Sequence, residues 1–304
     1  MEVLFTSRSG LPHDKQQRKG KTTVSISEQS IEVGSWEWFY REAKPVGDSR
    51  GVPVILLHGL PSQSFCWCEI MPDLAKVGYD AIAPDWLGSG LSAKPDRLDF
   101  PYTPDAFIEA LGDFLKHLEI ERFSLVVQGF LASVGLQYAL RHSDQIERLV
   151  ILNTPVSSAA KLPSKMQQWG WPFIGDMLTQ DPLLVDRTLE GGSRYRIEDN
   201  YLDLYRKPFL KSSDPGRSLV ATIKNIQMNQ SMAEIESGFR NWEKPTLIIW
   251  GLKDPWLPVE QAEQFANHLK NKELVKLEEA GHYPQEHWSK EISEILVPFL
   301  RRKA

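Results

Sequence analysis

Residues 123–140 read FSLVVQGFLASVGLQYAL, and this stretch decides the fold. It opens with a β-rich run from Phe123 to Val127, which breaks at Gln128-Gly129. The residues after the break have a spacing that suits a helix buried against a sheet. The small and apolar ones among them are Ala132, Val134, Leu136, Ala139 and Leu140. The stretch therefore predicts a strand, a sharp turn and a helix.

Further strands and helices alternate on both sides of this stretch. Continuous apolar runs, typical of strands buried on both faces of a parallel sheet, occupy residues 52–57, 79–84, 148–152, 245–250 and 274–277. Two β-rich runs that favour an antiparallel edge pair lie at 22–27 and 31–41. Helices are predicted at about 65–75, 104–118, 259–269 and 292–301, the second capped by Thr103. This alternation predicts an α/β fold with a doubly wound, mostly parallel sheet of eight strands.

The pattern changes between residues 155 and 242. Aromatic residues and methionines stand there among glycine, proline and charged residues, without a buried strand. We interpret this segment as a mostly helical cap, inserted between a first core segment, 22–154, and a second, 243–304. Residues 1–21 end in a polar and basic run without periodicity and predict a flexible leader.

Composition excludes several classes of protein. The 304 residues, 25% charged and 41% hydrophobic, are typical of one globular domain with an insertion. The net charge of -5 argues against nucleic-acid binding. No run approaches the roughly 18 apolar residues of a membrane span, so we expect a soluble protein. Cys66 and Cys68 are badly spaced for a disulfide and too few for a metal site, and no cofactor is predicted.

The loops after the predicted strands carry the chemistry. They read HGLP at 58–61, DWLGSG at 85–90, WGLKD at 250–254 and GHYP at 281–284. Because the carboxyl ends of parallel strands meet at one edge of a sheet, we expect these loops and Gly129 to lie together.

These motifs resemble the α/β-hydrolase fold, in which a nucleophile elbow, an acid and a histidine follow one another along the chain. The resemblance covers nearly all of residues 30–300. The LVVQ elbow, the HG-x-P loop and the position of the cap look most like haloalkane dehalogenases and epoxide hydrolases. More loosely, the chain resembles plastid-type members from plants and cyanobacteria. The resemblance thus implies the plastid stroma as the location, with the cytoplasm as the alternative.

The resemblance also assigns roles to residues. His282 would be the base, and Asp254 would fix its tautomer. The backbone N–H groups of Leu60 and Phe130 would form the oxyanion hole. The residues that would border the pocket are His58, Gly59, Gln128 and Trp86.

The chain departs from the family pattern at three of these positions. The nucleophile position falls on Gly129, which has no side chain to attack a substrate. Phe130 and Leu60 replace the Trp and Asn with which dehalogenases hold halide, so dehalogenation is not expected. Glycine relieves the strain that an elbow imposes on a residue with a Cβ. The nearest hydroxyl, that of Ser133, is expected to pack in the helix and face away from the elbow.

Three functions fit this set of residues, each with a pocket for a small apolar or amphipathic molecule or a surface for a protein partner. In the first, His282 and Asp254 activate water to hydrolyse an ester or epoxide without a covalent intermediate, or abstract a substrate proton. In the second, a pseudoenzyme only binds the ligand. In the third, the cap binds another protein. The retained base favours the first function, and Gly129 favours the other two.

Overall fold

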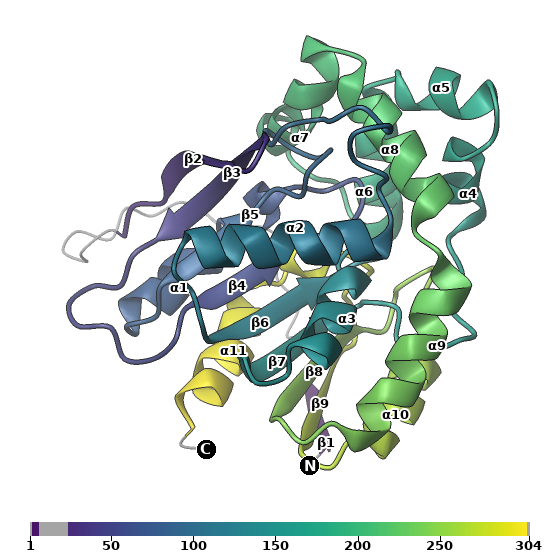
Figure 1. Ribbon diagram of the computed structural model, residues 1–304. Coiled ribbons are helices and arrows are strands. Elements are labelled where there is room, and N and C mark those ends of the chain that lie inside the picture. Colours follow the sequence, from purple (N-terminus) through teal and green to yellow (C-terminus); the bar gives the residue numbers. More distant parts are fainter. Residues whose placement is uncertain (1, 6–23, 303–304) are drawn as a thin grey trace.

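The computed structural model describes residues 2–5 and 24–302 (Figure 1). Its strands form one sheet in the order β1-β9-β8-β7-β6-β4-β5-β3-β2. The pairs from β5 through to β1 are parallel, and the pairs β3–β5 and β2–β3 are antiparallel. The strands are β1 (Glu2–Phe5), β2 (Ser27–Val33), β3 (Trp36–Ala43), β4 (Val54–Leu57), β5 (Ala81–Pro84), β6 (Phe123–Gln128), β7 (Ile146–Leu152), β8 (Thr246–Gly251) and β9 (Lys272–Leu277).

Strands β2 to β9 confirm the predicted mostly parallel sheet of eight strands. A ninth strand, β1, pairs with β9 at the far edge of the sheet. The prediction of a flexible leader is therefore wrong for residues 2–5, and the rest of that leader lies outside the described residues. The unpaired backbone N–H and C=O groups at the edge of a sheet can bind any extended segment, whatever its side chains. Such a strand needs no hydrophobic pattern, and so the sequence did not predict it.

The antiparallel edge pair turns at a different place from the one predicted. Ser27 pairs with Glu42 and Val33 with Trp36, so residues 31–33 belong to the first strand of the pair. The turn lies at Gly34, whose φ of +62° is readily adopted only by residues such as glycine.

Helices cover both faces of the sheet (Figure 1). On one face α2 packs against α3, and on the other α1 packs against α11. Thr103 caps α2 as predicted, accepting a hydrogen bond from the N–H of Ala106 at 3.3 Å. The α-helices are α1 (Met71–Lys76), α2 (Pro104–His117), α3 (Ser133–Arg141), α4 (Ser164–Trp169), α5 (Ile174–Thr179), α6 (Leu183–Ser193), α7 (Asp199–Lys211), α8 (Asp214–Asn225), α9 (Met228–Gly238), α10 (Val259–His268) and α11 (Ser289–Arg301).

The helix predicted at 65–75 is broken in two. A 3₁₀ turn, η1 (Ser64–Trp67), is followed by α1, and Pro72 stands in the first turn of α1. Proline lacks the N–H that continues a helix but fits a first turn, so the helix begins anew there. Two further 3₁₀ turns are η2 (Phe239–Asn241) and η3 (Pro284–Glu286).

The segment between β7 and β8 is helical, as expected of the cap. Helices α4 to α8 gather at the end of the sheet that is uppermost in Figure 1. Helix α9 instead packs against α3, where Glu234 accepts hydrogen bonds from Gln137 and Arg141. By its packing α9 belongs with the core, so the helices over the sheet end before residue 228 rather than at 242.

Candidate active site

Two glycines bring the elbow and the HG loop into contact. Strand β4 pairs with β6 so that Leu57 lies beside Val127, and the two loops that follow are neighbours. Gly129 has a φ of +85°, as the strained elbow requires. A Cβ placed on Gly129 would lie 2.9 Å from Cα of Gly59 and 3.7 Å from Nε2 of His282. Because Cβ atoms do not approach backbone carbon so closely, a nucleophile at this position would need one loop to move.

His282 and Asp254 form a hydrogen-bonded pair, as the sequence predicted. Nδ1 of His282 lies 2.8 Å from Oδ2 of Asp254, and both side chains are almost wholly buried. Oδ1 of Asp254 accepts hydrogen bonds from the N–H groups of Trp256 at 2.8 Å and Leu257 at 3.1 Å. A carboxylate held in this way is an acceptor for Nδ1–H, which leaves Nε2 as the basic nitrogen.

Asn153 supports the acid and was not singled out by the sequence. Its Nδ2 donates to Oδ2 of Asp254 at 2.8 Å, and its Oδ1 accepts from the N–H of Gly251 at 2.8 Å. Asn153 directly follows β7, which pairs with β8, the strand that precedes the loop of Asp254. A polar residue directly after a buried strand was the available signal, but the strand order was needed to connect it with Asp254.

Aromatic rings enclose the imidazole of His282. The ring of Phe130 stacks on it at 5.2 Å between centroids, and Trp256 contacts it at 4.7 Å. Nε2 is buried and has no hydrogen-bond partner among the described residues. It lies on the side of Gly129, so the one free nitrogen of the dyad faces the elbow.

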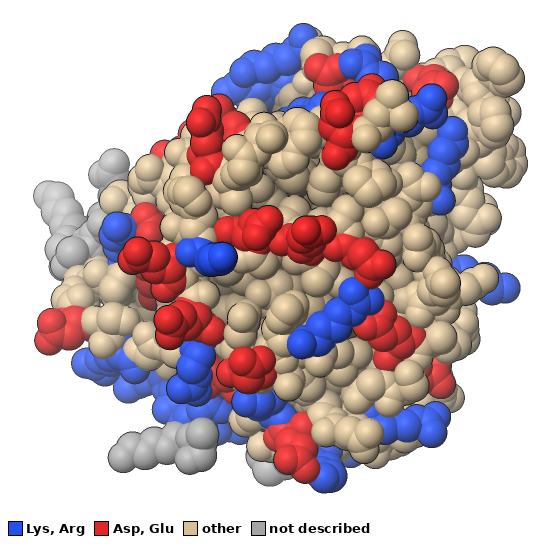
Figure 2. All heavy atoms as spheres, viewed as in Figure 1, with Lys and Arg blue, Asp and Glu red and all other residues tan. Residues whose placement is uncertain are grey.

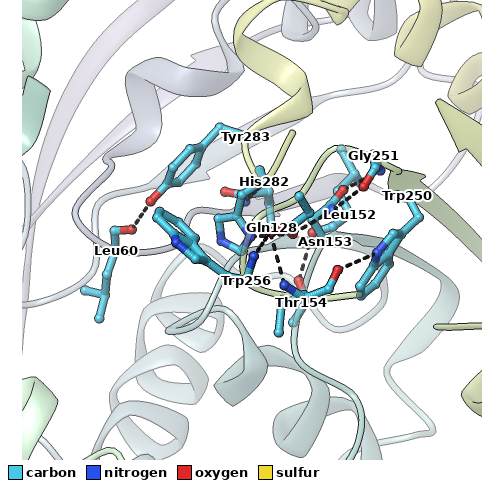
Figure 3. A network of polar contacts seen from close by, with 12 residues as sticks. Leu60, Gln128, Leu152, Asn153, Thr154, Trp250, Gly251, Trp256, His282 and Tyr283 are labelled. Carbon is cyan, nitrogen blue, oxygen red and sulfur yellow. Dashed lines mark hydrogen bonds and ion pairs between the residues drawn. The ribbon is translucent and has the colours of Figure 1, made fainter. Parts of the chain in front are cut away.

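The segment around His282 is tied to the loops opposite it. Nε2 of Gln128 donates to the carbonyl oxygen of His282 at 2.7 Å, and the Tyr283 hydroxyl donates to the carbonyl oxygen of Leu60 at 2.6 Å (Figure 3). The N–H of His282 donates to the carbonyl oxygen of Gly192 in α6 at 2.8 Å. The residue before Gly129, the HG loop and α6 are therefore all hydrogen-bonded to the segment that carries His282. The oxyanion hole of Leu60 and Phe130 stays a prediction.

His58 and Trp86 are joined by two hydrogen bonds. The N–H of Trp86 donates to Nε2 of His58 at 3.2 Å, and the indole N–H donates to the His58 carbonyl at 3.0 Å. Both side chains are fully buried. Burial lowers the pKa of His58, so its imidazole is neutral. The structure thus places both residues beneath the loops, where they join the ends of β4 and β5.

The hydroxyl of Ser133 and the two cysteine thiols do not replace a nucleophile at residue 129. The hydroxyl of Ser133 donates to the carbonyl oxygen of Phe130 at 2.7 Å, in agreement with its predicted packing role. Cys66 and Cys68 are free thiols. Burial raises the pKa of Cys66 well above its usual value and that of Cys68 to about 12, so neither is a thiolate at neutral pH.

The sequence did not predict the contact between Tyr205 of α7 and Glu286 of η3. The Tyr205 hydroxyl donates to Oε1 of Glu286 at 2.5 Å, and burial raises the pKa of Glu286 to about 7. Within residues 2–5 and 24–302, no group of His, Cys, Asp and Glu side chains is suited to hold a metal ion. None of the helices described is long and apolar enough to cross a membrane.

The comparison with known families gives the class. A family model described as "alpha/beta hydrolase fold" matches residues 52–287, and the chain belongs to that family. A cis-3-alkyl-4-alkyloxetan-2-one decarboxylase from Shewanella oneidensis is 28% identical over 276 residues, which are 84% of each chain. A haloalkane dehalogenase from Mycobacterium marinum is 29% identical over 218 residues, 69% of this chain and 71% of that protein.

A solved structure supports the fold. The crystal structure of haloalkane dehalogenase DbeA from Bradyrhizobium elkani superposes with a TM-score of 0.80 at 23% identity, covering 91% of this chain and 98% of the other. The predicted resemblance to the α/β hydrolases and their dehalogenase branch is confirmed. The likeness to plastid-type members stays a prediction.

Proposed function

We propose that the protein binds a small apolar or amphipathic molecule beneath its cap and hydrolyses an ester, lactone or epoxide in it, with His282 as the general base. The observation that carries this proposal is the unpartnered, buried Nε2 of His282 beside Gly129. Buried polar atoms with a purely structural role are nearly always hydrogen-bonded. A general base, by contrast, needs one nitrogen free for the proton that it takes.

The proposed reaction has no covalent intermediate. Nε2 accepts a proton from water while the water oxygen attacks the carbonyl carbon of an ester. The N–H groups of Leu60 and Phe130 would stabilise the negative charge on the carbonyl oxygen. The imidazolium, held by Asp254, then returns the proton to the leaving alkoxide, and an acid and an alcohol are released. An epoxide would open by the same attack, with the proton passing to the ring oxygen.

The surroundings of the HG loop support an apolar ligand. A narrow cavity of about 10 Å³ lies between this loop and the cap, and it is lined mainly by apolar residues and glycine: Leu60, Pro61, Gly88, Ser89, Gly90, Phe209, Pro215, Leu219 and Thr222. The named relatives act on a dialkyl oxetanone and on haloalkanes, which are also small and largely apolar. Because the cavity is so small, we expect the cap to move when a ligand enters.

A panel of esters, lactones and epoxides, assayed with wild-type protein and His282→Ala, tests the proposal. We expect turnover by the wild type that falls by about 10³-fold in the variant, within the range for loss of a general base. An exchange of Glu279, an exposed carboxylate paired with Lys253, for Gln serves as the control and should leave turnover unchanged. Equal turnover by the wild type and His282→Ala would refute the role of His282.

A second candidate function is that of a ligand-binding pseudoenzyme. It is favoured by the contact between Gly59 and Gly129, which leaves no room for a nucleophile unless the backbone moves. Absence of turnover, together with a small apolar molecule that co-purifies and is identified by native mass spectrometry, would establish this function instead. The plastid location and a protein partner for the cap stay predictions.

A further inference from the structure

One corner of the cap exposes an unusual number of large apolar side chains. Ten such side chains are exposed in the described part of the chain, and four of them lie within seven residues. These four are Trp171, Phe173, Ile174 and Met177, with exposed fractions of 50%, 88%, 41% and 68%. We call residues 171–177 the cap tip. Scattered apolar residues are normal on a protein surface, but a contiguous group of them indicates a site of interaction.

The backbone holds Phe173 in this exposed position at some cost. Phe173 has a φ of +63°, and the N–H of Ile174 donates across it to the carbonyl oxygen of Pro172 at 2.7 Å. This three-residue turn is rare, and a bulky residue at positive φ is strained. A Cβ on Gly175 would lie 2.1 Å from the carbonyl oxygen of the buried Trp169, so the cap tip is packed closely onto α4.

Exposed lysines lie on or next to the two helices, α4 and α8, that pack against α5. Lys165 belongs to α4, Lys161 precedes α4 in the chain, and Lys224 belongs to α8. Lys224 lies beside the tip, because a Cβ on Gly170 would come 3.6 Å from its Cγ. Within residues 24–302 these three lysines form no ion pair, and Asp176 is the one unpaired acid of the tip. Figure 2 shows this corner, over α5, as mostly uncharged surface with basic and some acidic side chains beside it.

We propose that the cap tip docks the protein on a lipid surface with anionic headgroups. Trp171, Phe173 and Met177 would enter the boundary between headgroups and acyl chains, where aromatic side chains are favoured. The three lysines would attract the lipid phosphates, although the whole chain carries a net charge of -5. A second copy of the chain is a poorer occupant, since a two-fold contact would bring the same lysines together. This proposal does not depend on the proposed reaction.

Vesicle co-sedimentation tests the proposal. We expect the protein to bind vesicles of phosphatidylcholine and phosphatidylglycerol at 3:1 in low salt, and to bind pure phosphatidylcholine at least tenfold more weakly. Exchanging Trp171 and Phe173 together for Ser should reduce binding at least tenfold. Leu98→Ser is the matched control, because Leu98 is 89% exposed outside the cap tip and should not contribute.

Several results would overturn the proposal. The wild type could fail to bind the anionic vesicles, or the double variant and the Leu98 control could bind equally well. Dimers that the wild type forms without lipid, and that the double variant loses in sedimentation velocity, would assign the tip to a second copy. If the double variant does not fold, exchange of Lys161 and Lys165 together for Glu provides a second test with the same expected loss of binding.

Discussion

The candidate site has two sides that differ in structure, the elbow with Gly129 and the hydrogen-bonded pair of His282 and Asp254. On the elbow side, Gly129 has no side chain, and the backbone of Gly59 lies so close that a Cβ would not fit. On the base side, His282 keeps a buried acid at 2.8 Å, and that acid accepts three further hydrogen bonds from Asn153, Trp256 and Leu257. The proposed nucleophile position is thus vacant and closed, whereas the proposed base keeps its hydrogen-bonded acid.

The difference indicates what constrains the site. Glycine at a strained turn is the stable choice when no side chain is required there. A buried Asp–His pair with one unpartnered nitrogen does not stabilise the folded protein in this way, because removing polar groups from water costs free energy. Retention of the base side is therefore better explained by chemistry or ligand binding than by stability.

The largest effect is expected from Asp254→Asn. The amide would donate to Nδ1 and leave the proton of the imidazole on Nε2, which removes the base. We expect kcat/KM for the best substrate to fall on the order of 10³-fold, because the corresponding exchange in serine proteases reverses the tautomer in the same way. Steady-state kinetics and thermal unfolding would be measured together. A variant that folds and keeps its activity within threefold would mean that Asp254 has only a structural role.

A smaller effect is expected from Gly129→Ala, measured as the free energy of unfolding in urea. Gly47 is a matched control, since its φ is also +85° and a Cβ there would meet nothing within 4 Å. Gly47→Ala should cost about 1 kcal/mol for the left-handed conformation alone. Gly129→Ala should cost about 2 kcal/mol more, because the HG loop must move. Equal costs at the two sites would show that the loops separate freely and would weaken the contrast.

The smallest effect concerns the pH dependence of stability through Glu286, four residues after His282. Its pKa is raised from 4.5 to about 7 by burial, so the folded state favours the protonated carboxyl. This contribution to stability is complete below about pH 4.5 and is lost as the pH rises through 7. The loss should be on the order of 2 kcal/mol after allowance for partial solvent access. Glu286→Gln should remove it while retaining a partner for Tyr205. An unchanged pH profile in urea unfolding would contradict this assignment.

Much of the site was predictable because its motifs directly follow buried strands. The loops that carry Gly129, Asp254 and His282 follow β6, β8 and β9. They lie close together because these strands are adjacent or one strand apart in the sheet. Asn153 was missed because its contact with Asp254 depends on the order of β7 and β8. The approach of Gly59 to Gly129 was missed because sequence patterns do not encode backbone distances of a few ångströms. The exposed cap tip was invisible too, because periodicity does not show which apolar residues of an irregular helical segment stay outside.

Rapid-quench intact-mass analysis during turnover of the best ester can detect a covalent intermediate on the protein. We expect acid and alcohol to form while the protein keeps its unmodified mass at every time point, because water attacks without a covalent intermediate. A transient increase equal to the acyl group would contradict this expectation and would reveal a nucleophile other than residue 129.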